Sequence, residues 1–282
     1  MTTTQLPIYV VEAFSSGSFG GNPAAVVPLE RWLSDALMQS IAAQNNLSET
    51  AFFVATDAGF HIRWFTPTRE VSLCGHATLA SAYVLFEHLG FEGERISFES
   101  LSGELSVTRL LTLGAEQAGT DLPLLALNFP AQMPASCAAP VGLAQALGLV
   151  SESSVLECFK GEDLVVVFES AADLAALSPN FAELKALDVR AVIVTAAGSP
   201  ETYDFVARVF APSVGIDEDP VTGSAYTKLA PIWAAKLGKT KLSARQLSAR
   251  GGDVFCELIG DRVQIAGSCM SYLKGEIEVS EP

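Results

Sequence analysis

The sequence predicts an α+β protein built from two similar halves. Segments rich in Val, Ile and Phe outnumber helical segments, and the two kinds do not alternate as a doubly wound parallel sheet requires. Segments 76–86 and 229–235 contain no Asp, Glu, Lys or Arg, which is typical of a helix that is buried on all sides. A short motif also occurs once in each half. We therefore expect two curved sheets, each rolled around one buried helix.

The individual elements follow from composition and apolar spacing. The predicted strands are 8–14, 24–29, 51–55, 60–66, 95–100, 104–110, 125–130, 164–169, 191–196, 203–210, 254–259 and 263–266. The predicted helices are 34–45, 76–89, 140–148, 171–187 and 224–237. Pro231 is expected to bend the last helix or to mark its break. Segment 111–124 carries Gly, Thr, Asp and Pro without periodicity and is the predicted linker.

The two halves share a sequence echo. Arg63-Trp64-Phe65-Thr66-Pro67 is followed 145 residues later by Arg208-Val209-Phe210-Ala211-Pro212, with three identities. Each copy precedes a glycine that opens a buried helix, Gly75 or Gly223, at a spacing of 12 residues in the first half and 15 in the second. Such an echo can arise by chance, but its coincidence with both buried helices favours an ancient duplication.

Composition excludes several classes of protein. The 282 residues include 32 acidic and 17 basic side chains, a formal charge of −15, so binding to nucleic acid or to an anionic membrane surface is not expected. The N-terminal segment 1–16 lacks Lys and Arg and does not resemble a targeting peptide. No uncharged apolar stretch reaches the roughly 18 residues of a membrane span. We expect a soluble, cytoplasmic protein of one large domain or two ordinary ones.

Cysteines and histidines give little support for a disulfide framework or a metal site. The five cysteines are odd in number and scattered, which favours a reducing compartment and mostly inert core thiols. The three histidines, His61, His76 and His88, have no metal-ligand pairing beside them. Residues 17–25 match neither a phosphate-binding loop nor a dinucleotide fingerprint, so no metal and no nucleotide cofactor is expected.

Two helix openings are candidate anion sites. The first turn of a helix has unpaired N–H groups and a partial positive charge, which suits a carboxylate. The candidates are Cys74-Gly75-His76-Ala77 and Thr222-Gly223-Ser224-Ala225. The alternative is that the glycines only make tight entries to core helices.

Two groups of acidic residues lie near these openings. Asp217, Glu218 and Asp219 precede the second buried helix, where capping accounts for one or two of them. Glu49 lies at the start of an apolar strand, where desolvation would raise the pKa of its carboxyl and make it a better proton acceptor. Composition alone does not single out Glu49 among the acidic residues as the catalytic proton acceptor.

These segments together resemble the PhzF-like family, relatives of the phenazine-biosynthesis isomerase with a diaminopimelate-epimerase-like fold. The matching segments are FSSGSFGGNPAAVV (14–27), NNLSETAFFV (45–54), IRWFTPTREVSLCGHATLASAYVLF (62–86) and RVFAPSVGIDEDPVTGSA (208–225). The resemblance implies two barrel-like domains, 1–118 and 119–270, with the first completed by a C-terminal strand within 271–282. It also implies an active site in the cleft between the domains and a homodimer.

The resemblance also implies roles for individual residues. Glu49 corresponds to the catalytic acid/base, and His76 and Asp219 to polar groups that orient the substrate or assist proton movement. The predicted substrate-binding residues are Gly75, Ala77, Thr222, Gly223 and Ser224. Tyr226 replaces a histidine often found after Gly-Ser-Ala, which puts any role of that position in doubt.

The expected reaction follows from a comparison with the epimerase relatives, which use one cysteine at each helix opening. Here Cys74 has Thr222 as its counterpart, and a hydroxyl cannot replace a thiol as acid or base, so a two-thiol racemase is not expected. A single carboxylate predicts a cofactor-independent isomerase that moves a proton and a double bond in a small, amino-acid-derived carboxylate. The alternatives are a non-catalytic small-ligand or partner-binding protein, and epimerisation through Cys74 with a second, unidentified base. Cys74 is expected to be a packed thiol.

Overall fold

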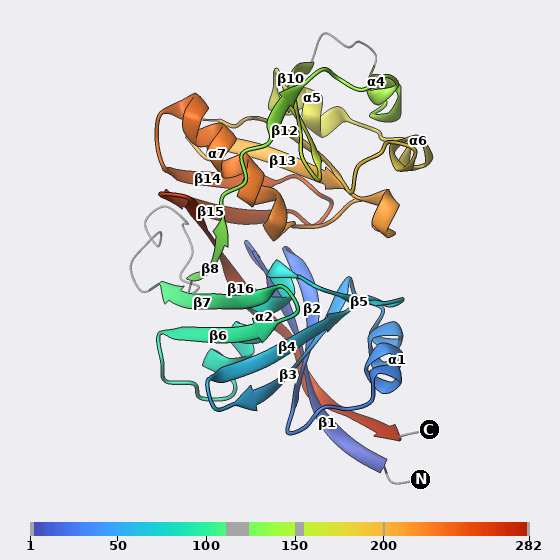
Figure 1. Ribbon diagram of the computed structural model, residues 1–282, viewed down its shortest axis with the longest axis vertical. Coiled ribbons are helices and arrows are strands. Elements are labelled where there is room, and N and C mark those ends of the chain that lie inside the picture. The colour runs from blue at the N-terminus through green and yellow to red at the C-terminus, as the bar shows by residue number, and fades with distance from the viewer. Residues whose placement is uncertain (1–2, 111–123, 150–154, 200, 281–282) are drawn as a thin grey trace. The chain divides into compact units, whose positions relative to one another are not determined.

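A computed structural model describes residues 3–110, 124–149, 155–199 and 201–280, which form two compact units (Figure 1). The first unit extends to Phe129 and resumes at Gln264, and the second comprises Pro130–Val263. The predicted boundary after 118 lies outside the described residues. The first unit resumes before the predicted residue 271 because Cys269 and Met270 already pair with the N-terminal strand.

The first unit is a closed ring of eight strands. The order around the ring is β1, β2, β3, β4, β6, β7, β8 and β16, and β16 pairs with β1 to close it. The strands are β1 (Thr3–Ala13), β2 (Asn22–Leu29), β3 (Glu49–Thr56), β4 (Gly59–Phe65), β6 (Arg95–Ser100), β7 (Gly103–Leu110), β8 (Leu124–Pro130) and β16 (Arg262–Ser280). The two-residue strand β5 (Glu70–Val71) pairs with β4.

The helix α2 (Gly75–Glu87) fills this ring. It contacts β1, β2, β3 and β7, which lie on different sides of the ring, and ten of its residues are buried. A helix without a charged side chain on any face except its last residue, Glu87, suits such an environment. The amphipathic α1 (Asp35–Asn45) instead packs against the other face of β2 and β3, where Leu37, Met38 and Ile41 join one apolar cluster.

The second unit is built on a seven-strand sheet, with the helix α7 on one face and three short helices on the other. Its order is β15, β14, β13, β12, β11, β10, β9, and β15 also pairs with the start of β16. The strands are β9 (Ala135–Cys137), β10 (Val155–Lys160), β11 (Leu164–Phe168), β12 (Val192–Ala197), β13 (Phe205–Phe210), β14 (Lys241–Gln246) and β15 (Gly252–Ile259). The helices are α4 (Leu143–Ala146), α5 (Ala171–Ala176), α6 (Phe181–Lys185) and α7 (Tyr226–Leu237), with short 3-10 turns η2 (Pro212–Val214) and η3 (Gly223–Ala225).

Alternation along β12 separates the two faces of this sheet. Val192 and Val194 join the apolar cluster of α5 and α6, whereas Thr195 accepts a hydrogen bond from the indole of Trp233 on α7 at 2.9 Å. The helix α7 continues past Pro231, so of the two expected effects of this proline, a bend or a break, the break is wrong. Proline lacks the N–H that would bond the carbonyl of Thr227, and the backbone N–H of Gln132 donates to that carbonyl instead at 2.9 Å.

The same strand order recurs in both units, which supports the duplication. Each unit contains a run of five neighbouring strands, β2-β3-β4-β6-β7 in the first and β11-β12-β13-β14-β15 in the second. In both runs the successive strand pairs are parallel, antiparallel, parallel and antiparallel. The echoed arginines have the same environment. Arg63 is paired with Glu70 and lies over Phe65, and Arg208 is paired with Glu218 and lies over Phe210. Glu70 and Glu218 each precede the helix-opening glycine by five residues, so the three-residue insertion lies between arginine and glutamate.

The α+β prediction of two sheets around buried helices is confirmed, with local corrections. The predicted helix 171–187 is two short helices, since the chain leaves the helical conformation at Leu177 and Pro179 lacks the N–H that a continuous helix would need. The predicted helix 140–148 is reduced to α4, and the predicted strand 263–266 belongs to the much longer β16. Strands β5, β9, β10 and β14 were not predicted, since they are short or carry charged residues. Of the described helices, none has the length and apolar character needed to cross a membrane.

Candidate functional site

Two polar centres lie at the openings of the buried helices, one in each unit. The first contains Glu49, the first residue of β3, together with Cys74 and His76 at the start of α2. The predicted binding residues Gly75 and Ala77 belong to the same helical turn. Glu49 and His76, two of the predicted site residues, therefore lie together, and both are buried.

A chain of short contacts passes through the imidazole of His76. Its Nε2 lies 3.2 Å from Oε2 of Glu49, and the two side chains are 7% and 11% exposed. On the other side of the ring, Nδ1 lies 3.4 Å from the amide nitrogen of Asn22 and 3.6 Å from Sγ of Cys74. Cys74 is thus a buried thiol that also contacts the proposed acid/base machinery.

Asn22 is a site residue that sequence reasoning did not single out, although it lies in the quoted segment 14–27. It is the first residue of β2 and is fully buried. The preceding Gly21 has φ +66, and a Cβ atom there would lie only 2.3 Å from the carbonyl oxygen of Ala13. Only glycine fits this tight approach, which sets the position from which Asn22 reaches His76.

These contacts define which nitrogen of His76 carries the proton. Burial lowers the pKa of His76 from 6.5 to about 3, so the ring is neutral at physiological pH. An amide nitrogen can only donate, so Nδ1 accepts from Asn22 and the single ring proton resides on Nε2. The protonated Nε2 is thus the ring nitrogen that lies 3.2 Å from Oε2 of Glu49, a close contact that lacks hydrogen-bond geometry.

Glu49, Cys74 and His76 are also the residues that could approach a single metal ion. One possible ligand atom from each lies within 4.8 Å of the others. However, the imidazole turns Nδ1 toward the thiol and Nε2 toward the carboxylate, so its two nitrogens face different partners. The ring thus presents a different atom to each neighbour, whereas a metal site requires its ligand atoms to converge on one ion.

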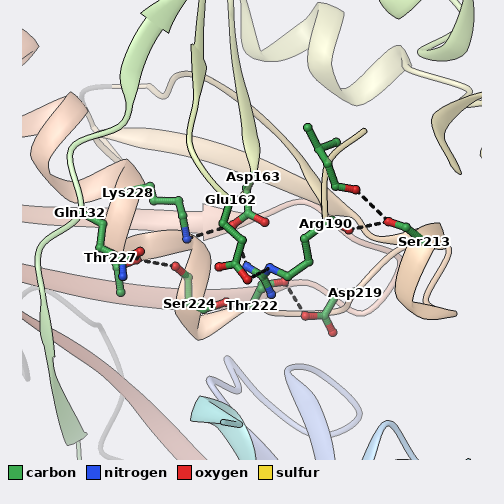
Figure 2. A network of polar contacts seen from close by, with 11 residues as sticks. Gln132, Glu162, Asp163, Arg190, Ser213, Asp219, Thr222, Ser224, Thr227 and Lys228 are labelled. Carbon is green, nitrogen blue, oxygen red and sulfur yellow. Dashed lines mark hydrogen bonds and ion pairs between the residues drawn. The ribbon is translucent and has the colours of Figure 1, made fainter. Parts of the chain in front are cut away.

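The second polar centre surrounds the start of α7. The hydroxyl of Thr222 donates to the carboxylate of Asp219 at 2.5 Å. Gly223 and Ser224 form the 3-10 turn η3 that leads into the helix, and Figure 2 shows Asp219, Thr222 and Ser224 at this opening. The predicted residues of the second half are thus also neighbours of one another. Glu218, in contrast, forms an ion pair with Arg208, which explains the presence of one of the three clustered acids.

Gln246 organises this centre and was missed because β14 was not predicted. Its side chain is fully buried at the end of β14. The amide donates to the carbonyl of Asp219 at 2.8 Å and to the Thr222 hydroxyl at 3.2 Å, and its oxygen accepts from the backbone N–H of Thr222 at 3.0 Å. The hydroxyl of Tyr226 points to the same oxygen at 3.5 Å, so Tyr226 is a buried packing residue of this network.

A buried ion cluster lies near the start of α7 in the second unit (Figure 2). Nζ of Lys228 lies 2.9 Å from Oδ2 of Asp163, and their side chains are 4% and 0% exposed. Arg190 contacts the same oxygen at 2.6 Å. Asp163 precedes β11 and Lys228 lies in the first turns of α7, so the pair links the helix to the sheet.

We expect Lys228→Met to lower the free energy of unfolding by about 1.5–3 kcal/mol, because it removes a charged hydrogen-bond partner of the buried Asp163 carboxylate and leaves Arg190 as its cation. Urea denaturation of both proteins measures the difference. Lys241→Met is the matched control, since Lys241 contacts Glu257 at 3.5 Å on the surface and such pairs contribute about 1 kcal/mol or less. Equal effects of the two substitutions would contradict the assigned role of the buried pair.

We expect His76 to remain neutral and protonated on Nε2 between pH 8 and pH 5. Long-range ¹⁵N–¹H spectra distinguish the tautomers, and His76→Asn identifies the signal among only three histidines. The unfolded chain binds a proton near pH 6.5 and the folded one near 3. This group's contribution to stability is thus complete above pH 6.5 and is lost as the pH falls toward 3. A ring that titrates near 6.5, or that carries its proton on Nδ1, would disprove the assignment.

Comparisons with known proteins agree with this architecture. The family described as "Phenazine biosynthesis-like protein" (PhzC-PhzF) matches residues 11–275. An uncharacterized isomerase of Pseudomonas aeruginosa is 48% identical over 275 residues, covering 98% of this chain and all of the relative. A crystal structure of a PhzF-family protein from Enterococcus faecalis has a TM-score of 0.89 at 44% identity and covers 97% of this chain and 99% of its own.

A more distant structure shows how far the fold extends. A hydroxyproline epimerase from Agrobacterium vitis has a TM-score of 0.59 at 11% identity and covers 99% of this chain and 94% of its own, which demonstrates a shared fold only. The family match and the close relatives span nearly the whole chain. The chain therefore belongs to the phenazine biosynthesis-like, or PhzF, family, in which its close bacterial relatives are named isomerases.

Proposed function

We propose that the protein is a cofactor-independent isomerase in which Glu49 takes a proton from one carbon of a small carboxylate and returns it to another. The observation that carries this proposal is the buried contact between Glu49 and the neutral His76. Relatives that are named isomerases support the reaction class.

The protonation state of His76 makes Glu49 the proton carrier. Nε2 already holds the ring proton, so it cannot accept the proton that Glu49 removes from a substrate. That proton therefore stays on Glu49 until it is returned. A single base that removes and returns a proton on one face of the substrate moves a double bond, whereas inversion at one carbon needs bases on both faces.

A two-thiol racemase is disfavoured by the environment of Thr222. Thr222 is the counterpart of Cys74 at the second helix opening, and its hydroxyl donates to Asp219. A hydroxyl with an ordinary alcohol pKa is a far weaker acid than a thiol. Cys74 lies within reach of His76 but has no matching thiol at this second opening.

We propose a small carboxylate as the substrate because each polar centre includes a turn that suits an anion. The N–H groups of Gly75, His76 and Ala77 open α2, and those of Gly223 and Ser224 open the turn before α7. The same donors would stabilise negative charge that develops on the substrate after proton removal, each contributing a few kcal/mol in a closed site. Asp219, held by Thr222 and Gln246, would orient a cationic group such as an amine.

We expect Glu49→Gln to reduce turnover by at least about a hundredfold, since it removes the general base. The assay incubates the protein in D₂O with a panel of small amino acids and unsaturated cyclic carboxylic acids and follows deuterium incorporation and double-bond migration by NMR. Glu99→Gln is the control, because Glu99 is an exposed acid on β6 of the same unit. Binding of the active acid, followed by the rise in Tm, should persist in Glu49→Gln.

The outcomes of this assay separate the alternatives. Full turnover by Glu49→Gln would show that another residue is the base. If Cys74→Ala abolishes turnover while Glu49→Gln does not, epimerisation through the thiol is the better explanation. If acids raise Tm but none is turned over or exchanged, the protein is a small-ligand binder.

We expect Ser224→Ala to raise KM about tenfold with a smaller effect on kcat, because one hydrogen bond to a bound anion contributes about 1.5 kcal/mol. Steady-state kinetics on the active acid from the panel measure both constants. Ser199→Ala, an exposed serine of the second unit, is the control and should change neither. An unchanged KM in Ser224→Ala would remove this hydroxyl from substrate binding.

A further inference from the structure

Two cysteines that are 21 residues apart in the sequence lie directly opposite each other in the second sheet. Cys137 ends β9, and Cys158 lies in β10. The two strands are antiparallel, and Cys137 and Cys158 are partners in their register. Both are free thiols. The sequence spacing gave no sign of this pairing, since β9 and β10 were not predicted as strands.

Both thiols point to the same side of the sheet. Directly opposed residues of an antiparallel pair project from one face. Cys158 is a buried member of the apolar cluster formed with α4 and α6, and Cys137 packs against that cluster. Burial and the nearby Cys137 raise the pKa of Cys158 to about 11, which is a second sign that the thiols are neighbours.

The backbone geometry suits a disulfide. Opposed residues in antiparallel strands have Cα atoms about 4.5–5.5 Å apart, and disulfides require about 4.4–6.8 Å. A cross-link between Cys137 and Cys158 therefore needs little movement of the backbone. The other cysteines have different partners, since Cys256 is opposed by Leu242 and Cys269 by Ala13.

We propose that Cys137 and Cys158 are a redox-active dithiol that forms a reversible disulfide with a small-molecule disulfide such as oxidised glutathione. The half-buried Cys137 attacks first as its thiolate, forms a mixed disulfide and releases one reduced glutathione. Cys158 then loses its proton, attacks the sulfur of Cys137 and displaces the second glutathione. Two electrons and two protons pass from the protein to glutathione, so the exchange is balanced.

A disulfide between Cys137 and Cys158 would join the edge strand β9 covalently to β10. β9 has three residues, and among the described residues it pairs only with β10. A disulfide would remove the freedom of β9 to separate from β10, so the oxidised protein should unfold at a higher temperature.

The test incubates the folded full-length protein with oxidised glutathione, blocks the remaining thiols with an alkylating reagent in denaturant and counts them by mass spectrometry. We expect three of the five thiols to be alkylated. Digestion after glutamate cuts at Glu157, so the peptides that carry Cys137 and Cys158 should remain joined until dithiothreitol is added. Tm should rise on oxidation and return on reduction.

Three variants make the result specific. Cys158→Ala should stop at a mixed disulfide with one glutathione on Cys137, and Cys137→Ser should lose the cross-link and the rise in Tm. Cys256→Ala, which removes a buried thiol without a cysteine opposite, should keep both. Five alkylated thiols after incubation, or a cross-link that involves another cysteine, would overturn the proposal. Neither result bears on Glu49, so this test is independent of the proposed isomerase activity.

Discussion

The contact between Glu49 and His76 is the constraint on which the candidate chemistry depends. A carboxylate in an apolar interior is costly unless hydrogen bonds compensate for the water that it loses. His76 places a neutral ring 3.2 Å from the carboxylate of Glu49, so the group at this contact is not a cation. The closed ring fixes the geometry, because Glu49 begins β3 and His76 opens the helix that the ring encloses. Asn22, at the start of β2, then determines which nitrogen of the ring can donate.

The two units share a framework and differ in the side chains placed on it. Phe65 and Phe210 are equivalent residues of the repeated motif, and they pair with Thr50 and Val192 on the neighbouring strands. The residues just before these two partners, Glu49 and Ala191, are therefore equivalent. The second unit thus has no carboxylate at this position. It has instead the Thr222–Asp219–Gln246 network and the buried pair of Lys228 and Asp163. The Arg63–Glu70 and Arg208–Glu218 pairs are retained in both units, which is consistent with a role in the fold rather than in the reaction.

Elements whose burial produces a recognisable residue pattern could be predicted from the sequence, and elements without such a pattern could not. Uncharged helices and segments rich in Val, Ile and Phe indicated the architecture, and the repeated arginine motif indicated the duplication. Strands β9, β10 and β14 were not predicted, because short or charged segments form strands only through pairing with partners that are distant in the sequence. Gln246 and the opposition of Cys137 and Cys158 depend on those strands, so neither could be foreseen. Glu49, His76 and Asp219 were predicted from family resemblance, since composition does not distinguish one acid from another.

The strand β16 has a consequence for how the protein is made. It is 19 residues long, begins beside β15 and ends beside β1, so the chain closes its N-terminal ring with its C-terminal residues. During translation, the first seven strands of that ring leave the ribosome well before the one that completes it. Until then β1 and β8 present open edges, which are sites for unwanted association. The N-terminal part of the chain must therefore stay soluble while the entire second half is synthesised. Acidic side chains outnumber basic ones in this N-terminal part, and the resulting negative charge favours its solubility.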